Sequence, residues 1–506
     1  MKILDCTLRD GGYYTNWDFE PELVKEYLTT INTLPIEYIE IGYRQPAKCD
    51  YMGEYAYLPL QTIEQCQKYA PNKKLALMLN LKDVDEGSIT RLIEPIQSII
   101  PLIRFATTPK DIEKVAKISI ITRKLGIKVS ANIMYMSTWL SDEQFWQQLP
   151  LLNGNIDMLC MVDSYGAVYP HEILQIITRV KKVISAPIGF HGHDNMTLAY
   201  ANTLAALQAG CEIVDSTIMG MGRGAGNLRT ELLMTYCAKE NTQINLNGLV
   251  ELIERFTPLQ EKYGWGTNLP YMISGVNSLP QKDIMAMLSQ KRYSIAHIVR
   301  LLQNNLRPIK SNQYPNITMA SKAESILLIG GGVSVSKHIK AIVDYLVKNP
   351  QISICFLSAK HIALFDIINN PRYICLVGNE GVRVEKNAGV FHDTDFFVVS
   401  DTNSSETYIP ECMKERTYVV PSNNHFDLPD APLALAMDLV SNISTGQMIL
   451  LIGMDGYSKT KRSDIFDMMH ESQVIIDAYA GKYHFKSLLP TEYKHVEQSS
   501  IYAELV

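Results

Sequence analysis

The chain has 506 residues, of which 46% are hydrophobic and 20% charged, and this composition excludes intrinsic disorder as its main character. A net charge of −6 argues against a nonspecific nucleic-acid binder, and the sequence contains no run of about 18 apolar residues of the kind that spans a membrane. Charges at Lys2 and Asp5 are atypical of a secretory signal. We therefore predict a cytoplasmic protein with no nucleic-acid or membrane partner.

The nine cysteines are an odd number and include no C-x-x-C pair. This pattern argues against a disulfide scaffold or a structural zinc site, and it is typical of reduced thiols in a cytoplasmic protein.

The first 270 residues alternate short apolar runs with longer amphipathic stretches. Eight runs have the length and composition of strands: residues 2–7, 38–42, 75–79, 102–106, 128–134, 158–163, 188–191 and 213–218. Amphipathic stretches such as 111–124 and 171–184 separate them. Eight strands that alternate with helices predict an N-terminal (β/α)8 TIM barrel over residues 1–270. An open doubly wound sheet is the alternative.

The rest of the chain predicts a second α/β domain. Helical patterns at 280–290 and 294–302 predict a helical extension of the barrel over residues 271–310, and the polar segment 311–324 predicts a linker. Residues 325–506 then show strand-like runs separated by helical patterns, at 326–329, 352–357, 373–377, 395–399 and 448–452. We expect an open, Rossmann-like parallel sheet there.

Polar residues follow the first, seventh and eighth predicted strands, at the end of a barrel where active sites lie. His191 and His193 are two residues apart, so both side chains point to the same side of a strand. Asp10 follows the first strand, which closes the barrel against the eighth. Two imidazoles and a carboxylate suit a divalent transition metal, and Asn227 offers an amide oxygen to the same ion. Two unrelated surface histidines are the alternative.

Arg9 directly precedes the predicted metal ligand Asp10. Its planar guanidinium matches a carboxylate, which predicts a clamp on a 2-oxo acid whose enolate the metal stabilises. A salt bridge at the barrel end is the alternative. The glycines between Gly220 and Gly226 allow a loop to approach a ligand closely.

Three segments carry a resemblance to a known family: residues 4–11 (LDCTLRDG), 189–195 (GFHGHDN) and 222–227 (GRGAGN). They resemble the HMG-CoA lyase-like (DRE-TIM) metallolyase superfamily and, within it, the 4-hydroxy-2-oxovalerate aldolases. Residues 163–167 (DSYGA) also resemble these enzymes, and the resemblance covers about residues 1–310.

The resemblance implies a metal-dependent aldolase or lyase that acts through a pyruvate-type enolate on a small 2-oxo acid and an aldehyde. Mn²⁺ or Mg²⁺ would be held by Asp10, His191 and His193, and Arg9 would stabilise the enolate. The implied substrate-binding residues are Arg9, Asp163, Gly222 and Gly224. An aldehyde dehydrogenase partner and a homo-oligomer are also implied.

Tyr13 departs from the pattern of the family, because the aldolases have a proton-transferring His at this position. A phenol, with a pKa near about 10, is a poor base at pH 7 but can donate a proton. Tyr271 lies in a segment similar to the one that holds the catalytic Tyr of the family. Tyr13 and Tyr271 are therefore candidate catalytic residues, with a packing role as the alternative for Tyr13.

The second domain begins with a strand that ends in Gly330-Gly331-Gly332-Val333-Ser334, which does not match G-x-G-x-x-G. A turn that feeds a helix N-terminus can bind phosphate, so we predict a phosphorylated ligand such as a nucleotide or nucleotide sugar at Gly331, Gly332 and Ser334. The alternative is a tight turn that serves only packing.

Two other functions stay open. The first is a Claisen-type acyl transferase of the same superfamily, although residues 325–506 do not resemble its usual regulatory domain. The second is a noncatalytic nucleotide- or sugar-binding protein that retains the metal barrel. A requirement for acyl-CoA would identify the first, and absence of turnover with 2-oxo acids would identify the second.

Overall fold

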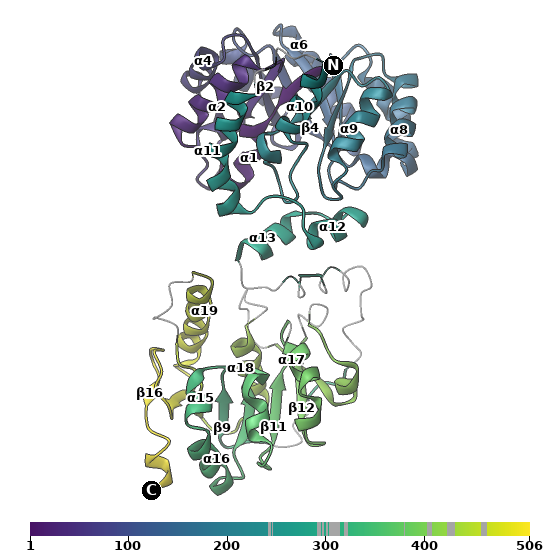
Figure 1. Cartoon of the computed structure of the whole chain (residues 1–506). Helices are drawn as coiled ribbons and strands as arrows, with labels where there is room; N and C mark the ends of the chain where they lie inside the picture. Colours follow the sequence, from purple (N-terminus) through teal and green to yellow (C-terminus); the bar gives the residue numbers. More distant parts are fainter. Residues whose placement is uncertain are drawn as a thin grey trace. The chain divides into compact units, whose positions relative to one another are not determined.

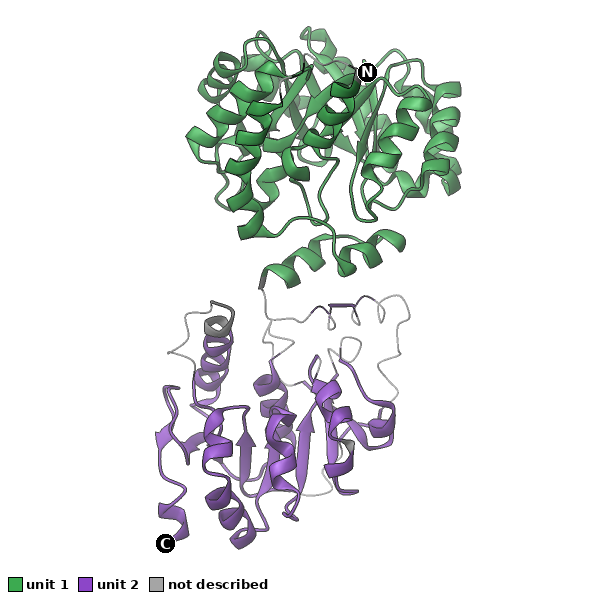
Figure 2. Cartoon of the chain, viewed as in Figure 1, with its two compact units in different colours: residues 1–289 green, residues 290–506 purple. Residues whose placement is uncertain are grey.

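The computed structural model describes residues 1–240, 244, 246–290, 295, 298–299, 302, 314–317, 322–378, 380–401, 407–422, 431–456 and 463–506. The chain divides into two compact units, residues 1–289 and 290–506, which are coloured separately in Figure 2. Within the described ranges, no helix is both long and apolar enough to cross a membrane.

The first unit is a closed barrel of eight parallel strands, all within the fully described residues 1–216, which confirms the predicted TIM barrel. β1 pairs with both β2 and β8, so that Leu4 lies opposite Tyr38 and Lys2 opposite Ile213. The strands are β1 (Lys2–Asp5), β2 (Tyr38–Tyr43), β3 (Lys74–Asn80), β4 (Leu102–Thr107), β5 (Lys128–Ile133), β6 (Met158–Asp163), β7 (Ile188–Gly192) and β8 (Ile213–Ser216).

Helices surround these strands (Figure 1). They are α2 (Pro21–Thr33), α3 (Glu54–Tyr57), α4 (Leu60–Tyr69), α5 (Glu86–Ile93), α6 (Ile112–Lys124), α7 (Glu143–Gln148), α8 (Pro170–Val183), α9 (Ala199–Gln208), α10 (Thr230–Glu240) and α11 (Asn247–Tyr263). In α8 the buried residues recur every three or four positions, so one face of the helix packs on the barrel.

The interior of the barrel is filled by two kinds of layer. Apolar side chains, among them Leu102, Met158 and Ile213, pack together toward the amino ends of the strands. Two residues further along two of these strands, and therefore on the same inward side, are Arg104 and Asp215. A buried charged layer thus lies between the apolar plug and the carboxyl ends of the strands.

The barrel mouth is built by helices at both ends of the unit's sequence. α1 (Thr7–Thr15) begins two residues after β1, so Arg9 and Tyr13 lie one helical turn apart. A Cβ on Gly12 would lie 2.1 Å from the ring of Trp17, so this position needs glycine. α12 (Leu269–Val276) and α13 (Lys282–Gln290) follow α11, and the Asn195 amide ties them to the mouth by donating to the Tyr271 carbonyl and accepting from Gln281.

In its described residues, the second unit contains an open, fully parallel sheet of eight strands, which confirms the predicted α/β domain. The spatial order is β13-β12-β11-β10-β9-β14-β15-β16. The strands are β9 (Ile326–Ile329), β10 (Ser353–Phe356), β11 (Arg372–Cys375), β12 (Phe396–Ser400), β13 (Thr417–Val420), β14 (Met448–Ile452), β15 (His484–Ser487) and β16 (Glu497–Gln498).

Helices cover both faces of this sheet, because alternate residues of the buried strands belong to two separate cores. Leu328 and Cys355 belong to one core, together with α18 (Pro432–Ile443) and α19 (Ser463–Tyr479). Leu327 and Ile354 belong to the other, together with α16 (Ile339–Lys348) and α17 (Glu380–Lys386). The short helix α15 (Val333–Lys337) follows β9.

The predicted extension and linker lie partly outside the described residues. Of 311–324, residues 314–317 and 322–324 are described, and both pieces hydrogen-bond to the sheet and helices of the second unit, to which they belong. Ile317 donates its amide to the Val419 carbonyl at 2.8 Å, and Ala323 donates to the Ile443 carbonyl at 3.0 Å. A separate linker between the units stays a prediction.

Candidate functional site

A cavity of about 170 Å³ opens at the carboxyl ends of the barrel strands. The loop or strand end of almost every βα unit contributes to its wall. Five of the predicted site residues line it together: Arg9, Asp10, Tyr13, His191 and His193. The other polar lining residues are Tyr43, Asn80, Asn132, Tyr135, Ser164, Tyr165, Arg223, Gln281 and Lys282.

The two histidines are each oriented by a partner on Nδ1. The His191 Nδ1 lies 3.0 Å from the Asp215 carboxylate, and its Nε2 lies 3.6 Å from Asp10 Oδ2. The His193 Nδ1 lies 2.7 Å from the backbone carbonyl of Asp163. Both partners are acceptors, so each Nδ1 donates a hydrogen bond, and Nε2 is the ring nitrogen that would face an ion. This is the arrangement in which histidines bind metals.

Asn227 and Asp10 complete the donor set. The Asn227 Nδ2 donates to Asp10 Oδ2 at 2.7 Å. Its buried Oδ1 has no hydrogen-bond partner among the described residues, so an acceptor is left over where a cation would use one. One carboxylate, two imidazole nitrogens and one amide oxygen are donors of the kind that a divalent transition metal takes.

A second group of possible ligands, Cys6, His191 and Asp215, has its donor atoms within 4.8 Å of one another. This group suits a metal less well. A thiol ligand suits softer metals, whereas Mn²⁺ and Mg²⁺ favour oxygen donors. The Asp215 carboxylate is already held by Arg104 at 2.5 Å.

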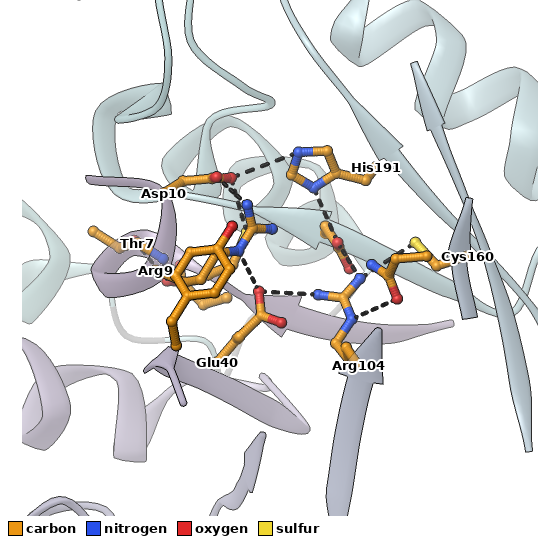
Figure 3. A network of polar contacts seen from close by, with 12 residues as sticks. Thr7, Arg9, Asp10, Glu40, Arg104, Cys160 and His191 are labelled. Atoms are coloured by element: carbon orange, nitrogen blue, oxygen red, sulfur yellow. Dashed lines mark hydrogen bonds and ion pairs between the residues drawn. The ribbon is translucent and has the colours of Figure 1, made fainter. Parts of the chain in front are cut away.

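A buried network connects Arg9 to His191 through the charged layer of the barrel. Arg9 donates from Nε to Glu40 at 2.7 Å, and from Nη1 to Asp10. Glu40 also lies 3.3 Å from Arg104, whose Nη2 contacts Asp215. Figure 3 shows Glu40 between Arg9 and Arg104, joined to both. The residue that would bind substrate and the residue that would bind metal thus share one framework.

The charges in this framework keep the carboxylates ionised. Burial opposes ionisation of Asp215, but Arg104 and the hydrogen bond from His191 lower its pKa to about 2. Burial likewise opposes ionisation of Asp10, whose pKa the charge of Arg9 holds below its ordinary value. Burial and nearby His191 lower the pKa of His193 to about 3, so its imidazole is neutral, as a metal ligand must be.

Tyr13 belongs to a small polar cluster on the wall of the cavity. Its hydroxyl lies 2.7 Å from the Tyr43 hydroxyl, so one phenol donates to the other. The Arg223 guanidinium lies over the Tyr13 ring, 3.8 Å from the centroid. The two hydroxyls form a short path along which a proton can move.

The other predicted residues lie outside the cavity wall. The Asp163 carboxylate accepts from the backbone amides of Ala167 and Val168, so Asp163 acts on the site through its carbonyl. A Cβ on Gly222 would meet the Asn227 amide at 2.5 Å, and one on Gly224 would meet Gln281 at 2.0 Å. Tyr271 is buried beside Tyr14 rather than in the lining.

In the second unit, the donors of the predicted phosphate site are engaged within the chain. The Ser334 amide donates to Asp455 at 3.0 Å, and its hydroxyl donates to the same carboxylate. A Cβ on Gly332 would lie 2.5 Å from that carboxyl group, whereas one on Gly331 would make only ordinary contacts, 3.6 Å from Ser358.

Sequence reasoning missed Glu40, Arg104, Asp215 and Tyr43. The first three are charged residues inside strands whose other residues are almost all apolar. A charged residue inside a buried strand needs a partner of opposite charge. The single charge in each of these apolar runs could therefore have indicated a buried ion-pair network.

Comparisons with known proteins place these residues in a family. A family model described as HMGL-like matches residues 102–255. The chain is 30% identical over 268 residues to 4-hydroxy-2-oxovalerate aldolase of Carboxydothermus hydrogenoformans. This alignment covers 50% of this chain and 76% of that protein. It is 23% identical over 305 residues to oxaloacetate decarboxylase of Mycobacterium tuberculosis, over 59% of this chain and 89% of that protein.

A solved structure is similar to the first part of the chain. The crystal structure of the N-terminal domain of a candidate aldolase from Bacteroides vulgatus is 43% identical, with a TM-score of 0.56. The match covers 59% of this chain and 99% of that one.

Proposed function

Because the chain belongs to the HMGL-like family and its barrel is that of a metal-dependent lyase, we propose that it is an aldolase for 4-hydroxy-2-oxo acids that acts through a pyruvate-type enolate. One observation carries the proposal. Two oriented imidazoles, the Asp10 carboxylate, Arg9 and the Tyr13 hydroxyl surround a single small cavity.

Asp10, His191 and His193 would hold the ion, with Asn227 Oδ1 as a further oxygen donor. Two imidazoles favour Mn²⁺ over Mg²⁺, which prefers an all-oxygen shell. A divalent cation bound there supplies Lewis acidity toward the ketone oxygen of a 2-oxo acid.

Arg9 is held so that one edge remains for substrate. Its Nε and Nη1 are used by Glu40 and Asp10, and Nη2 has no partner among the described residues. Nη2 carries two N–H groups, so this edge can donate to the oxygens of a 2-oxo acid, as the sequence predicts. We assign Arg9 to the enolate oxygen, where negative charge develops as the carbon–carbon bond breaks.

Proton transfer is assigned to Tyr13 and Tyr43. In the cleavage direction the 4-hydroxyl loses its proton, the C3–C4 bond breaks, an aldehyde leaves, and the enolate takes a proton at C3. The two phenols would act as one chain: the first accepts the 4-hydroxyl proton while it donates its own to the second, and the proton of the second goes to C3, so the pair ends with the protons it began with. This explains how a chain with Tyr13 at the position of the aldolase His can function.

The volume of the cavity favours a short substrate. A cavity of about 150 Å³ accommodates a molecule the size of benzene, so about 170 Å³ suits pyruvate and the first carbons of an aldehyde. On the wall, the Asn132 amide oxygen accepts from Arg104 and Ser130, which leaves its Nδ2 as a donor for a substrate oxygen.

Pyruvate release tests the proposal. The purified chain, loaded with Mn²⁺, is offered 4-hydroxy-2-oxo acids of increasing length, oxaloacetate, and pyruvate with acetyl-CoA. We expect pyruvate from the short hydroxy-oxo acids, and its loss after chelation of the metal. Turnover of oxaloacetate alone would replace the aldolase by a decarboxylase, and turnover that needs acetyl-CoA would replace it by an acyl transferase.

A further inference from the structure

A second large cavity, of about 580 Å³, lies in the second unit at the carboxyl end of its sheet. Its floor is formed by residues that directly follow three adjacent strands: residues 330–333 after β9, 357–360 after β10 and 453–456 after β14. β9 is the first strand of this sheet in sequence but lies in its interior, with β10 on one side and β14 on the other. The order of strands therefore reverses between β9 and β14, and open α/β sheets bind ligands at such a reversal.

Glycines let the backbone itself form the floor of this cavity. A Cβ on Gly330 would lie 2.4 Å from the Gly453 carbonyl oxygen, so the loops after β9 and β14 pack backbone to backbone. Gly331 is different, because a Cβ there meets nothing closer than 3.6 Å and Gly331 lines the cavity. The backbone at Gly331 is thus open to a ligand and tolerates a side chain.

Two cations lie on the part of the wall contributed by one face of the sheet. Lys360 donates to the Gly331 carbonyl at 3.0 Å, and Arg383 of α17 donates from Nη1 to Glu380 at 2.9 Å and to the Ser358 hydroxyl at 3.3 Å. Each of these contacts uses one donor, so two N–H groups of Lys360 and the far edge of Arg383 are left for an anion among the described residues. The two carboxylates of the wall are hydrogen-bonded within the chain, Asp455 by both donors of Ser334 and Glu380 by Arg383.

The helices that cover the other face contribute an apolar part of the wall. Pro432 and Leu433 of α18, Met454 after β14 and Met468 of α19 line it. Met468 is 42% exposed, so part of its side chain is accessible to a ligand. The flexible, polarisable methionine side chain is well suited to pack on a flat ring. The cavity thus joins an apolar surface to a cationic one across the edge of the sheet.

We propose that this cavity binds a nucleotide, with the heterocycle against Leu433, Met454 and Met468 and the phosphates at Lys360 and Arg383. The sequence predicted that the phosphate binds at Ser334, but the donors of Ser334 bind Asp455. We therefore place the phosphate at Lys360 and Arg383 instead. The proposal depends on residues of the second unit and stands apart from the aldolase chemistry of the barrel.

Calorimetric titration of the full chain with ADP, GDP, CDP, UDP and inorganic pyrophosphate tests the proposal. We expect at least one nucleoside diphosphate to bind more tightly than pyrophosphate. Lys360→Ala/Arg383→Ala should weaken it by about 10- to 100-fold, the worth of one or two charge-assisted hydrogen bonds. Lys386→Ala, an exposed cation of the same helix outside the cavity, should bind as wild type does.

Two further variants locate the site. Gly331→Leu should block binding of the nucleotide without lowering the melting temperature, because there is room for a side chain only inside the cavity. Asp10→Asn, in the barrel, should leave nucleotide binding unchanged. The proposal is overturned if no nucleotide binds at about 1 mM, if pyrophosphate binds as tightly as the nucleotides, or if the double variant retains wild-type affinity.

Discussion

Each unit contains a buried Arg–Asp pair, and the two pairs differ in how completely their polar atoms are satisfied. In the second unit, Arg372 donates from Nε to Asp395 at 2.6 Å and from its other nitrogens to the Phe365 and Val390 carbonyls. The His392 amide donates to the same carboxylate at 2.8 Å. This set of hydrogen bonds is closed, and it requires no ligand.

The pair in the barrel, Arg104 and Asp215, is open. Asp215 Oδ1 and Glu40 Oε1 are buried without a hydrogen-bond partner among the described residues, and Arg104 Nη1 has only its ion pair with Glu40 at 3.3 Å. A buried polar atom left without a partner lowers stability, so it persists in a native fold where function requires the group. The comparison teaches that the closed pair holds a fold together, whereas the open one orients groups that act on something else.

The largest effect is expected where the open network meets the metal. His193→Ala removes a ligand that no neighbouring side chain replaces, so bound metal and turnover should both fall to background. Elemental analysis of the purified variant measures the first and pyruvate release the second. His171→Ala, an exposed histidine on α8, is the control and should retain both. Wild-type metal content in His193→Ala together with His191→Ala would contradict the assigned site.

Arg9→Lys tests the other end of the network. A lysine ammonium cannot contact Glu40, Asp10 and a substrate oxygen in the fixed geometry of a guanidinium. We expect metal content to be retained and kcat to fall by roughly 10²-fold, the scale for removing one positioned electrostatic group. Turnover close to that of the wild type would reject Arg9 as the stabiliser of the enolate.

The two pairs can be broken in parallel. Asp215→Asn should lower metal affinity or turnover by about 10- to 100-fold, as expected for a residue that orients a ligand. Asp395→Asn should leave both unchanged and destabilise the second unit by about 3–5 kcal/mol, the cost of leaving a buried Arg uncompensated. All four tryptophans (Trp17, Trp139, Trp146 and Trp265) lie in the barrel unit, so their fluorescence reports barrel unfolding separately from far-UV circular dichroism. If Asp215→Asn and Asp395→Asn changed metal binding equally, the functional difference between the two Arg–Asp pairs would be refuted.

The burial of each strand explains which strands could be predicted from the sequence. All eight barrel strands were predictable because each is an apolar run buried on both sides. In the second unit, β13 at one edge of the sheet and β15 and β16 at the other were missed; His484 is exposed in β15, and both residues of β16 are exposed. β16 is an edge strand and β15 lies next to it, and strands in such places are buried less fully, so they carry little hydrophobic signal.

Site residues follow a similar rule. Asp10, His191 and His193 stand just after strands or at their ends, where polar residues interrupt an apolar pattern and are easy to recognise. Arg104 and Asp215 lie inside strands, where only the closed barrel brings them together, 111 residues apart in sequence. The free Nη2 of Arg9 could not be foreseen either, because its contact with Glu40 depends on the same closure.

Asp163 provides the finest test of this contrast, because its carboxylate is buried without a cation. Both oxygens accept hydrogen bonds from backbone amides, those of Ala167 and Val168, yet burial raises the pKa of Asp163 to about 7. Arg104, in contrast, helps to lower the pKa of Asp215 to about 2.

The pKa of Asp163 is raised in the folded chain, so its stabilising contribution is complete below the unfolded pKa of about 3.9 and is lost as pH rises through about 7. Asn does not titrate, so the stability advantage of the wild type over Asp163→Asn should shrink by about 2 kcal/mol between pH 5 and pH 7. Urea unfolding followed by tryptophan fluorescence at both pH values measures this difference. An advantage that stays constant with pH would mean that Asp163 is ionised throughout, and that backbone amides alone can hold a buried carboxylate as Arg104 does.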